Sequence, residues 1–130
     1  MSITPPPIKA REVLGGHDPV FDEDTGTGTV RYTPGAALIN PAGTVLGGYL
    51  AAMLDDVAGL ATWYAAGKRA FATAQMSTSF LRGAKEGETL TATATVSGYG
   101  KRQAFVEAKL TRDSDGRTVA TATLVQTYLD

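Results

Sequence analysis

The chain has 130 residues, of which 43% are hydrophobic, and its 12 basic and 13 acidic residues leave a formal net charge of −1. This length predicts one compact domain over residues 1–130 that buries about two thirds of its unfolded surface. The mixed, balanced charges argue against nucleic acid or an anionic membrane as a partner. The chain has no cysteine and one histidine, His17, so we expect no disulfide and no metal centre. No cofactor is expected.

The amino-terminal residues 1–7 contain three consecutive prolines, which favour an extended, flexible arm. They lack a basic stretch followed by an apolar core, so no secretory signal is predicted and a cytoplasmic location is expected. Residues 8–14 are predicted to form a short helix. A turn cluster at residues 22–28 then precedes a predicted strand at residues 29–33.

An apolar stretch from Val45 to Ala66 predicts one long helix whose only charges are Asp55 and Asp56. It is long enough to cross a bilayer, but two central aspartates would cost about 2.5 to 3.5 kcal/mol each on insertion, which argues against a membrane span. A helix that is apolar all round needs a cover on its far side, which a partner subunit would supply. Burying a carboxylate is costly unless it is paired, and catalysis is the reason we favour for keeping one here.

After Gly67 the pattern changes to an alternation of apolar and polar residues, which is typical of strands. Four strands are predicted, at residues 71–81, 89–96, 103–111 and 118–129. Their short, turn-like separators predict an antiparallel meander. With an earlier strand or two, the expected fold is α+β, with an antiparallel sheet of five to six strands and one long helix packed across it or wrapped by it.

The start of the predicted helix offers an anion site, because its first amides lack internal partners and the helix dipole adds positive charge. Gly47 and Gly48 lie there and would let a ligand oxygen approach the backbone, as acyl transfer requires; a simple turn is the competing interpretation. At 100° per residue, Asp55 falls about 80° round the axis from Gly47, and Asp56 about 180°. Asp55 is therefore the acid on the glycine side, and Asp56 is a candidate for pairing with an Arg or Lys.

Polar and apolar residues outside this pair are further candidates. Asn40 precedes the helix and can orient a water or a carbonyl, or form a turn. Thr73 lies at the start of the first late strand. Its hydroxyl either takes part in the site, or the residue is only a structural part of the sheet. Basic side chains at strand ends and turns can reach ligand phosphates, or provide only solubility: Arg82, Lys85, Lys101 and Arg102. Four large apolar residues either line an apolar pocket or belong to the core: Met53, Trp63, Tyr64 and Phe80.

Residues 40–48, Asn-Pro-Ala-Gly-Thr-Val-Leu-Gly-Gly, followed by Asp55, resemble the motif of the hotdog-fold acyl-CoA thioesterases of the phenylacetic-acid-degradation (PaaI-like) type. That motif runs Asn, a Gly, His-Gly-Gly, and then an acid nine residues after the His. The resemblance extends from about residue 29 to residue 128. It implies a central helix wrapped by an antiparallel sheet, subunits joined edge to edge as a homo-oligomer, either a dimer or a tetramer of two dimers, and active sites at the subunit interface.

The same resemblance implies an enzyme that hydrolyses an acyl-CoA substrate to a carboxylic acid and free CoA. Asp55 matches the catalytic carboxylate, which acts as general base or nucleophile. Gly47 matches the residue whose amide polarises the thioester carbonyl. Asn40 matches a polar residue that orients water or substrate, and Thr73 matches a hydroxyl near the attacking group. The residues expected to contact substrate are Leu46, Gly48, Arg82, Lys85, Lys101 and Arg102.

Leu46 is the departure from this motif, because it stands where the family usually has histidine. Losing one hydrogen bond in a dry site would slow the reaction about 10- to 100-fold. The alternative function is therefore a hydrolytically weak acyl-CoA-binding hotdog protein. A dehydratase or hydratase acting on acyl thioesters is a third hypothesis, disfavoured because those enzymes use a His and acid pair and His17 lies outside the motif.

Overall fold

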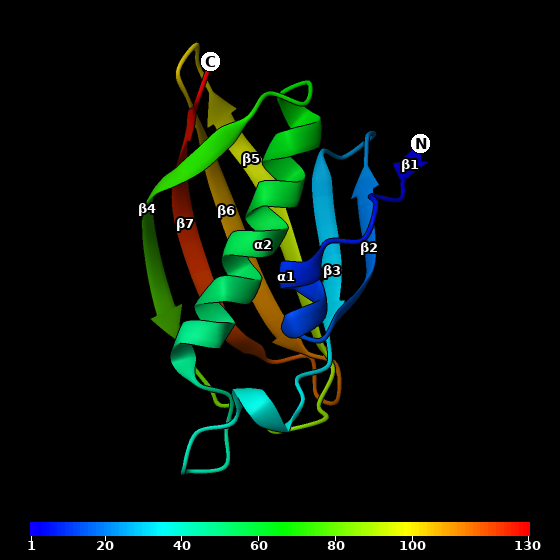
Figure 1. Cartoon of the computed structure of the whole chain (residues 1–130), viewed down its shortest axis with the longest axis vertical. Helices are drawn as coiled ribbons and strands as arrows, with labels where there is room; N and C mark the ends of the chain where they lie inside the picture. The colour runs from blue at the N-terminus through cyan, green and yellow to red at the C-terminus, as the bar shows by residue number, and fades with distance from the viewer.

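One long helix lies in the hollow of a curved antiparallel sheet in the computed structural model, which describes all 130 residues (Figure 1). The helix, α2, spans Gly47–Ala65, and α1 (Lys9–Val13) and the 3-10 turn η1 (Ala36–Leu38) are short. The strands are β1 (Ser2–Ile3), β2 (Gly16–Asp22), β3 (Thr27–Tyr32), β4 (Phe71–Phe80), β5 (Leu90–Tyr99), β6 (Gln103–Arg112) and β7 (Thr118–Tyr128). The expected α+β fold is confirmed, with seven strands where five or six were predicted.

The order of the strands in the sheet is β1-β2-β3-β5-β6-β7-β4, which corrects the predicted meander. β5, β6 and β7 follow one another as expected, but β4 pairs with β7 at the far edge instead of with β5. The connection from β4 to β5 is short yet spans about three interstrand spacings, or about 14 Å. It is held by the loop ahead of α2, where the Val45 amide donates to the Ala84 carbonyl at 2.8 Å.

The two strands that the sequence pattern did not predict lie at the amino-terminal edge. β2 contains Pro19 and has an irregular register between His17 and Val20, so its alternation is broken. β1 is two residues long, and it lies within the segment expected to be a flexible arm: Ser2 pairs with Asp22, and Pro5 is buried. An extended, proline-rich segment is compatible with pairing at a sheet edge.

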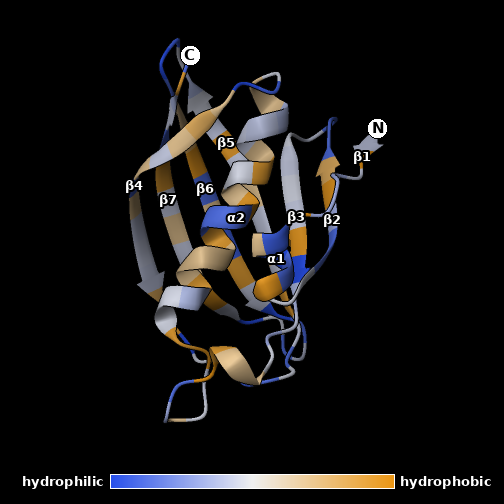
Figure 2. Cartoon of the chain, viewed as in Figure 1, coloured by the Kyte–Doolittle hydropathy of each residue, from blue (hydrophilic) through white to orange (hydrophobic).

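The buried face of α2 packs on the concave side of the sheet and contributes Leu50, Met53, Leu54, Val57, Ala58, Leu60, Ala61 and Thr62. β3 crosses closely under the helix at Gly28, where an added Cβ would lie 2.8 Å from Leu60 and 3.3 Å from Ala61. A hydrophilic turn in the middle of α2 faces α1 (Figure 2). No helix of the structure has the length and apolar composition needed to cross a membrane.

A β-bulge in β4 sets which of its side chains face α2. Thr73 pairs with Gln126 and Gln75 pairs with Val125, so Ala74 is the extra residue. Directly opposed residues point to the same face of a sheet, and Gln126 points inward. The bulge therefore turns Phe71 and Thr73 toward the helix, on the face that Met76 and Thr78 occupy farther along the strand.

Candidate active site

Asp55 and Thr73 meet where the middle of α2 faces the bulge of β4. The Thr73 hydroxyl donates a hydrogen bond of 2.6 Å to Asp55 Oδ1, and Gln126 Nε2 lies 3.4 Å from the Thr73 oxygen. Asp55 Oδ2 has no hydrogen-bond donor within the chain. A carboxylate held through one oxygen with the other free is suited to take a proton or to attack an electrophile.

Asp56 points about 100° round the helix axis from Asp55 and is bound by groups from two other elements. Arg11 donates from Nε to Oδ2 at 2.8 Å and from Nη2 to Oδ1 at 3.2 Å, and the Tyr32 hydroxyl lies 2.5 Å from Oδ2. The side chains of Arg11 and Asp56 are only 7% and 10% exposed. Burial, and then the Asp56 carboxylate, raise the pKa of Tyr32 well above its usual range. The predicted pairing of Asp56 with a cation is confirmed, so its role is structural.

A cleft of about 460 Å³ opens beside Asp55, between α2 and the amino-terminal segment. Its walls include Pro5, Pro6, Ile8, Leu60, Trp63, Tyr64 and Phe71. Trp63 and Tyr64 thus line a pocket, which was one of the two interpretations of these residues from the sequence. Met53 is fully buried in the core, and Phe80 is exposed at the other end of the helix beside Gly47. The cleft places an apolar, partly aromatic surface next to the Asp55 carboxylate.

The amides of Gly47 and Gly48 at the start of α2 have no hydrogen-bond partner within the chain. The preceding carbonyl, that of Leu46, accepts from the amides of Tyr49 and Leu50, and the Leu46 side chain is 49% exposed. Both free amides point along the helix axis, where the dipole favours an anion. Gly47 is eight residues from Asp55, which is about 12 Å along the axis.

Asn40 closes the loop ahead of α2. Its Oδ1 accepts hydrogen bonds from the Ala42 amide at 3.0 Å, the Thr44 amide at 3.1 Å and the Thr44 hydroxyl at 3.3 Å. Asn40 therefore forms a turn, which was one of the two interpretations of this residue from the sequence. Its side chain contacts neither Asp55 nor Thr73 within the chain, so the structure does not bring it to the carboxylate.

The four basic candidates lie at opposite ends of the sheet. Arg82 and Lys85 follow β4 near the start of α2, whereas Lys101 and Arg102 form the turn between β5 and β6 near its end. The ten-residue strands that separate the two pairs are about 33 Å long. Arg82 donates to the Thr118 carbonyl at 2.8 Å. Within one chain, the four cations therefore do not form a single phosphate site.

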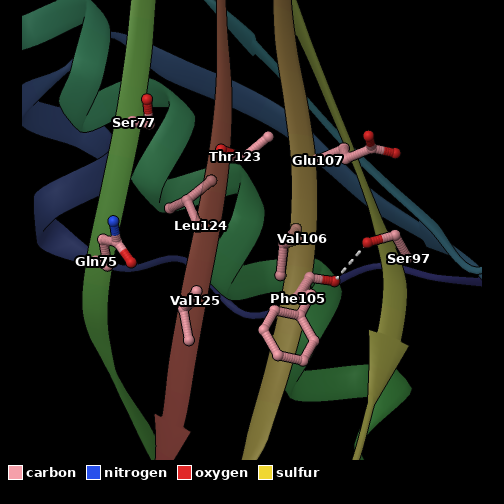
Figure 3. A pocket seen from close by; sticks show the side chains of 9 residues that line it. All are labelled: Gln75, Ser77, Ser97, Phe105, Val106, Glu107, Thr123, Leu124 and Val125. Carbon is pink, nitrogen blue, oxygen red and sulfur yellow. Dashed lines mark hydrogen bonds between the residues drawn. The ribbon is translucent and has the colours of Figure 1, made fainter.

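A second hollow, of about 260 Å³, lies on the outer face of the sheet, and α2 is behind it (Figure 3). Polar side chains of neighbouring strands line it, among them Gln75, Ser77 and Thr123, with Glu107 and the ring of Phe105. The one side-chain hydrogen bond among these residues runs from Ser97 Oγ to the Phe105 carbonyl at 3.1 Å. None of the candidate catalytic residues reaches this face.

Three residues that surround Asp55 and Asp56 were not identified from the sequence: Arg11, Tyr32 and Gln126. For Gln126 a signal exists, because the alternation of residues 118–129 places this amide on the apolar face, in line with Ala122 and Leu124. Arg11 and Tyr32 reach Asp56 across 45 and 24 residues of chain. No local pattern reports such contacts.

Comparison with known proteins identifies the family. A model of the thioesterase superfamily matches residues 42–119. A phenylacetic acid degradation-related protein of Ralstonia eutropha JMP134 is 33% identical, with a TM-score of 0.81 over 94% of this chain and 92% of that chain. The E. coli PaaI protein of the phenylacetic acid degradation operon is 26% identical, with a TM-score of 0.77 over 91% and 86% of the two chains.

A Streptococcus mutans protein whose structure holds acetyl CoA shares the fold, with 24% identity and a TM-score of 0.72 over 80% of this chain and 82% of that chain. A search of curated proteins finds no significant match. The chain belongs to the thioesterase superfamily. Within it, the protein is a hotdog-fold thioester hydrolase of the PaaI type.

Proposed function

We propose that the protein hydrolyses an acyl-CoA thioester to a carboxylic acid and free CoA, with Asp55 as general base or nucleophile and the Gly47 amide polarising the carbonyl. The observation that carries the proposal is the Asp55 carboxylate, held at 2.6 Å by Thr73 and bordering an apolar cleft. The free Oδ2 would take a proton from water or attack the thioester carbon. The cleft would receive the acyl group, because its walls are apolar and aromatic.

The two catalytic groups must come from two chains. Asp55 and the Gly47 amide are separated by about 12 Å along one helix, and a reacting carbonyl with its attacking atom spans about 3 Å. One thioester cannot reach both groups of a single chain. The site we propose therefore combines the Gly47 end of one subunit with Asp55 of a second copy.

The free edge of β4 supplies a way to join two copies. β4 has ten residues, pairs only with β7, and carries mostly exposed side chains. Long unpaired edges readily accept another strand, and a twofold dimer pairs the same edge antiparallel with itself. Such pairing brings the Phe80 end of one β4 toward the Phe71 end of the other. Gly47 lies against Phe80, and Asp55 lies against Thr73, so the two groups approach each other.

The same pairing would gather the basic side chains. Arg82 and Lys85 of one subunit would lie at the sheet end where a second copy carries Lys101 and Arg102. These cations suit the phosphates of CoA, for which the acetyl CoA complex of the Streptococcus mutans protein is a precedent in this fold. We propose a dimer as the catalytic unit, with two dimers forming the tetramer.

Gly47→Pro tests the amide, because proline removes the N–H and its ring is tolerated at the first position of a helix. Leu46 already has the extended ψ of 134° that a following proline requires. Gly47→Ala is the matched control: it keeps the amide, and its Cβ would meet the Phe80 ring at an ordinary 3.6 Å. Free thiol release from short, medium and aryl CoA esters should fall about 100-fold or more in Gly47→Pro and in Asp55→Asn, and little in Gly47→Ala.

Mixing the two inactive variants tests whether the site is shared. A mixed dimer of Asp55→Asn and Gly47→Pro chains has one intact site, with Gly47 from one chain and Asp55 from the other. After subunit exchange, random pairing should restore about a quarter of the wild-type rate. No recovery despite demonstrated exchange would overturn the shared site, and unchanged turnover in Asp55→Asn would overturn the proposed chemistry.

A hydrolytically weak acyl-CoA-binding protein is the second candidate, favoured by Leu46 at the helix start. Its 49% exposed side chain offers no hydrogen bond beside the Gly47 amide. Tight binding of CoA esters in calorimetry, without acid-dependent product release, would support this function over hydrolysis.

A further inference from the structure

Gln126 is a fully buried amide on the inner face of β7, directly opposite Thr73. The adjacent inward residues of β7 are Leu124 and Tyr128, and Ala104 lies opposite on β6; all three are buried. Gln126 Nε2 lies 3.4 Å from the Thr73 hydroxyl oxygen, which is its only polar side-chain partner. Its Oε1 is buried with no hydrogen-bond partner at all.

The hydrogen bonding of Thr73 fixes the orientation of this amide. A hydroxyl has a single hydrogen, and that of Thr73 is directed to Asp55 Oδ1 at 2.6 Å. The Thr73 oxygen can then only accept a hydrogen bond from its other neighbour. Gln126 must therefore present its NH₂ group to Thr73, and its carbonyl must point away into the apolar core.

Stability alone does not account for glutamine at this position. A buried carbonyl without a partner destabilises the folded state, and an apolar side chain of equal size would remove that penalty. The benefit must come from the one group that the amide reaches. We infer that Gln126 is a positioning residue, which donates to the Thr73 oxygen and so holds the Thr73 hydroxyl on the Asp55 carboxylate.

Donation from Gln126 acts on Thr73 in two ways. It favours the one side-chain rotamer that places the Thr73 oxygen between the two partners. It also polarises the O–H bond, because hydrogen bonds in a chain strengthen one another. The chain from Gln126 through Thr73 to Asp55 would thus keep Asp55 aimed at the cleft. Its effect on turnover rests on the proposed function, but its effect on Thr73 does not.

Gln126→Met removes the donor and the orphaned carbonyl while keeping the volume of the side chain. We expect kcat to fall about 10-fold with KM unchanged, because one supporting hydrogen bond is lost and substrate is not touched. The melting temperature should stay the same or rise. Leu124→Met is the matched control on the same face of β7, and it should leave kcat unaltered. A lower melting temperature with kcat and KM both unchanged would indicate a purely structural Gln126.

A double-mutant cycle tests whether Gln126 acts through Thr73. In a Thr73→Val background, Gln126→Met should have no further effect on kcat. A full 10-fold loss in that background would overturn the inference, because Gln126 would then act independently of Thr73.

A readout without turnover separates this inference from the proposed function. Three-bond NMR couplings to the Thr73 methyl group report its χ1 rotamer. We expect one rotamer in the wild type and in Leu124→Met, and averaging over several in Gln126→Met. A single unchanged rotamer in Gln126→Met would overturn the inference even in an active enzyme. Averaged couplings in a protein with no thioesterase activity would support the positioning and contradict only the proposed reaction.

Discussion

Asp55 and Asp56 are neighbours in sequence whose carboxylates have different hydrogen-bond partners. Asp55 is held by one neutral hydroxyl, that of Thr73, and lines the cleft with its other oxygen free. Asp56 is clamped by the Arg11 guanidinium and the Tyr32 hydroxyl. Consecutive residues of a helix differ by 100° in direction, so one carboxylate is available for chemistry while the next anchors α1 and β3 to the helix.

The Arg11–Asp56 pair should be essential to stability because it is buried and joins distant elements. Arg11→Ala leaves the Asp56 charge buried and uncompensated, and it should lower the free energy of unfolding by about 3–5 kcal/mol. Urea denaturation monitored by circular dichroism measures this change in the free energy of unfolding. Arg31 and Asp113 form an exposed pair with 3.6 Å between charged atoms, so Arg31→Ala should cost less than about 1 kcal/mol. Equal losses in the two variants would contradict the structural role of Asp56.

Tyr32 predicts a loss of stability at alkaline pH. Its folded-state pKa is raised, so in the unfolded chain it releases its proton above about pH 10 while in the folded chain it keeps it. The unfolded state then binds fewer protons, and stability falls as pH rises by about 1.4 kcal/mol per pH unit for this one group.

Tyr32→Phe isolates this contribution, because phenylalanine does not titrate. Urea unfolding of both proteins between about pH 9 and pH 11 should give a shallower decline for Tyr32→Phe, although that variant is less stable at neutral pH after losing its bond to Asp56. Parallel declines would show that Tyr32 does not hold its proton through the fold.

Leu46→His should increase turnover. The side chain at this position is 49% exposed beside the free Gly47 amide, so an imidazole would fit without disturbing the core. One added hydrogen bond to the thioester region should raise kcat about 10-fold. Steady-state rates of Leu46→His, Leu46→Ala and the wild type make the comparison. If Leu46→His and Leu46→Ala behave alike, the histidine of the family motif has no counterpart role in this site.

Trp63 should govern the preference for the acyl group. It lines the cleft beside Asp55 and is 37% exposed. Trp63→Ala removes apolar contact from a bulky acyl group but not from an acetyl group, so kcat/KM for medium-chain and aryl esters should fall about 10-fold relative to acetyl-CoA. Phe105→Ala, on the outer face, is the matched aromatic control. An equal loss for all esters would place Trp63 outside the acyl pocket.

Local patterns predicted the elements that carry the site. The apolar stretch at residues 45–66 matches α2 at Gly47–Ala65, and the four late strands match β4 to β7 within a few residues. Helical angles alone separated Asp55 from Asp56 and suggested a cation for the latter. These features follow from residue periodicity and from the geometry of a single helix, which do not depend on distant parts of the chain.

The order and register of the strands depend on long-range pairing, which the periodicity of the sequence does not reveal. Simple alternation along residues 71–81 gives no sign of the extra residue at Ala74, yet that bulge turns Thr73 toward Asp55 and sets it opposite Gln126. Loop length likewise suggested a hairpin where β4 crosses to the far edge of the sheet. That edge position leaves β4 open to a second copy. Such choices depend on which strands pair and in which register, because a shift of one residue moves every following side chain to the other face.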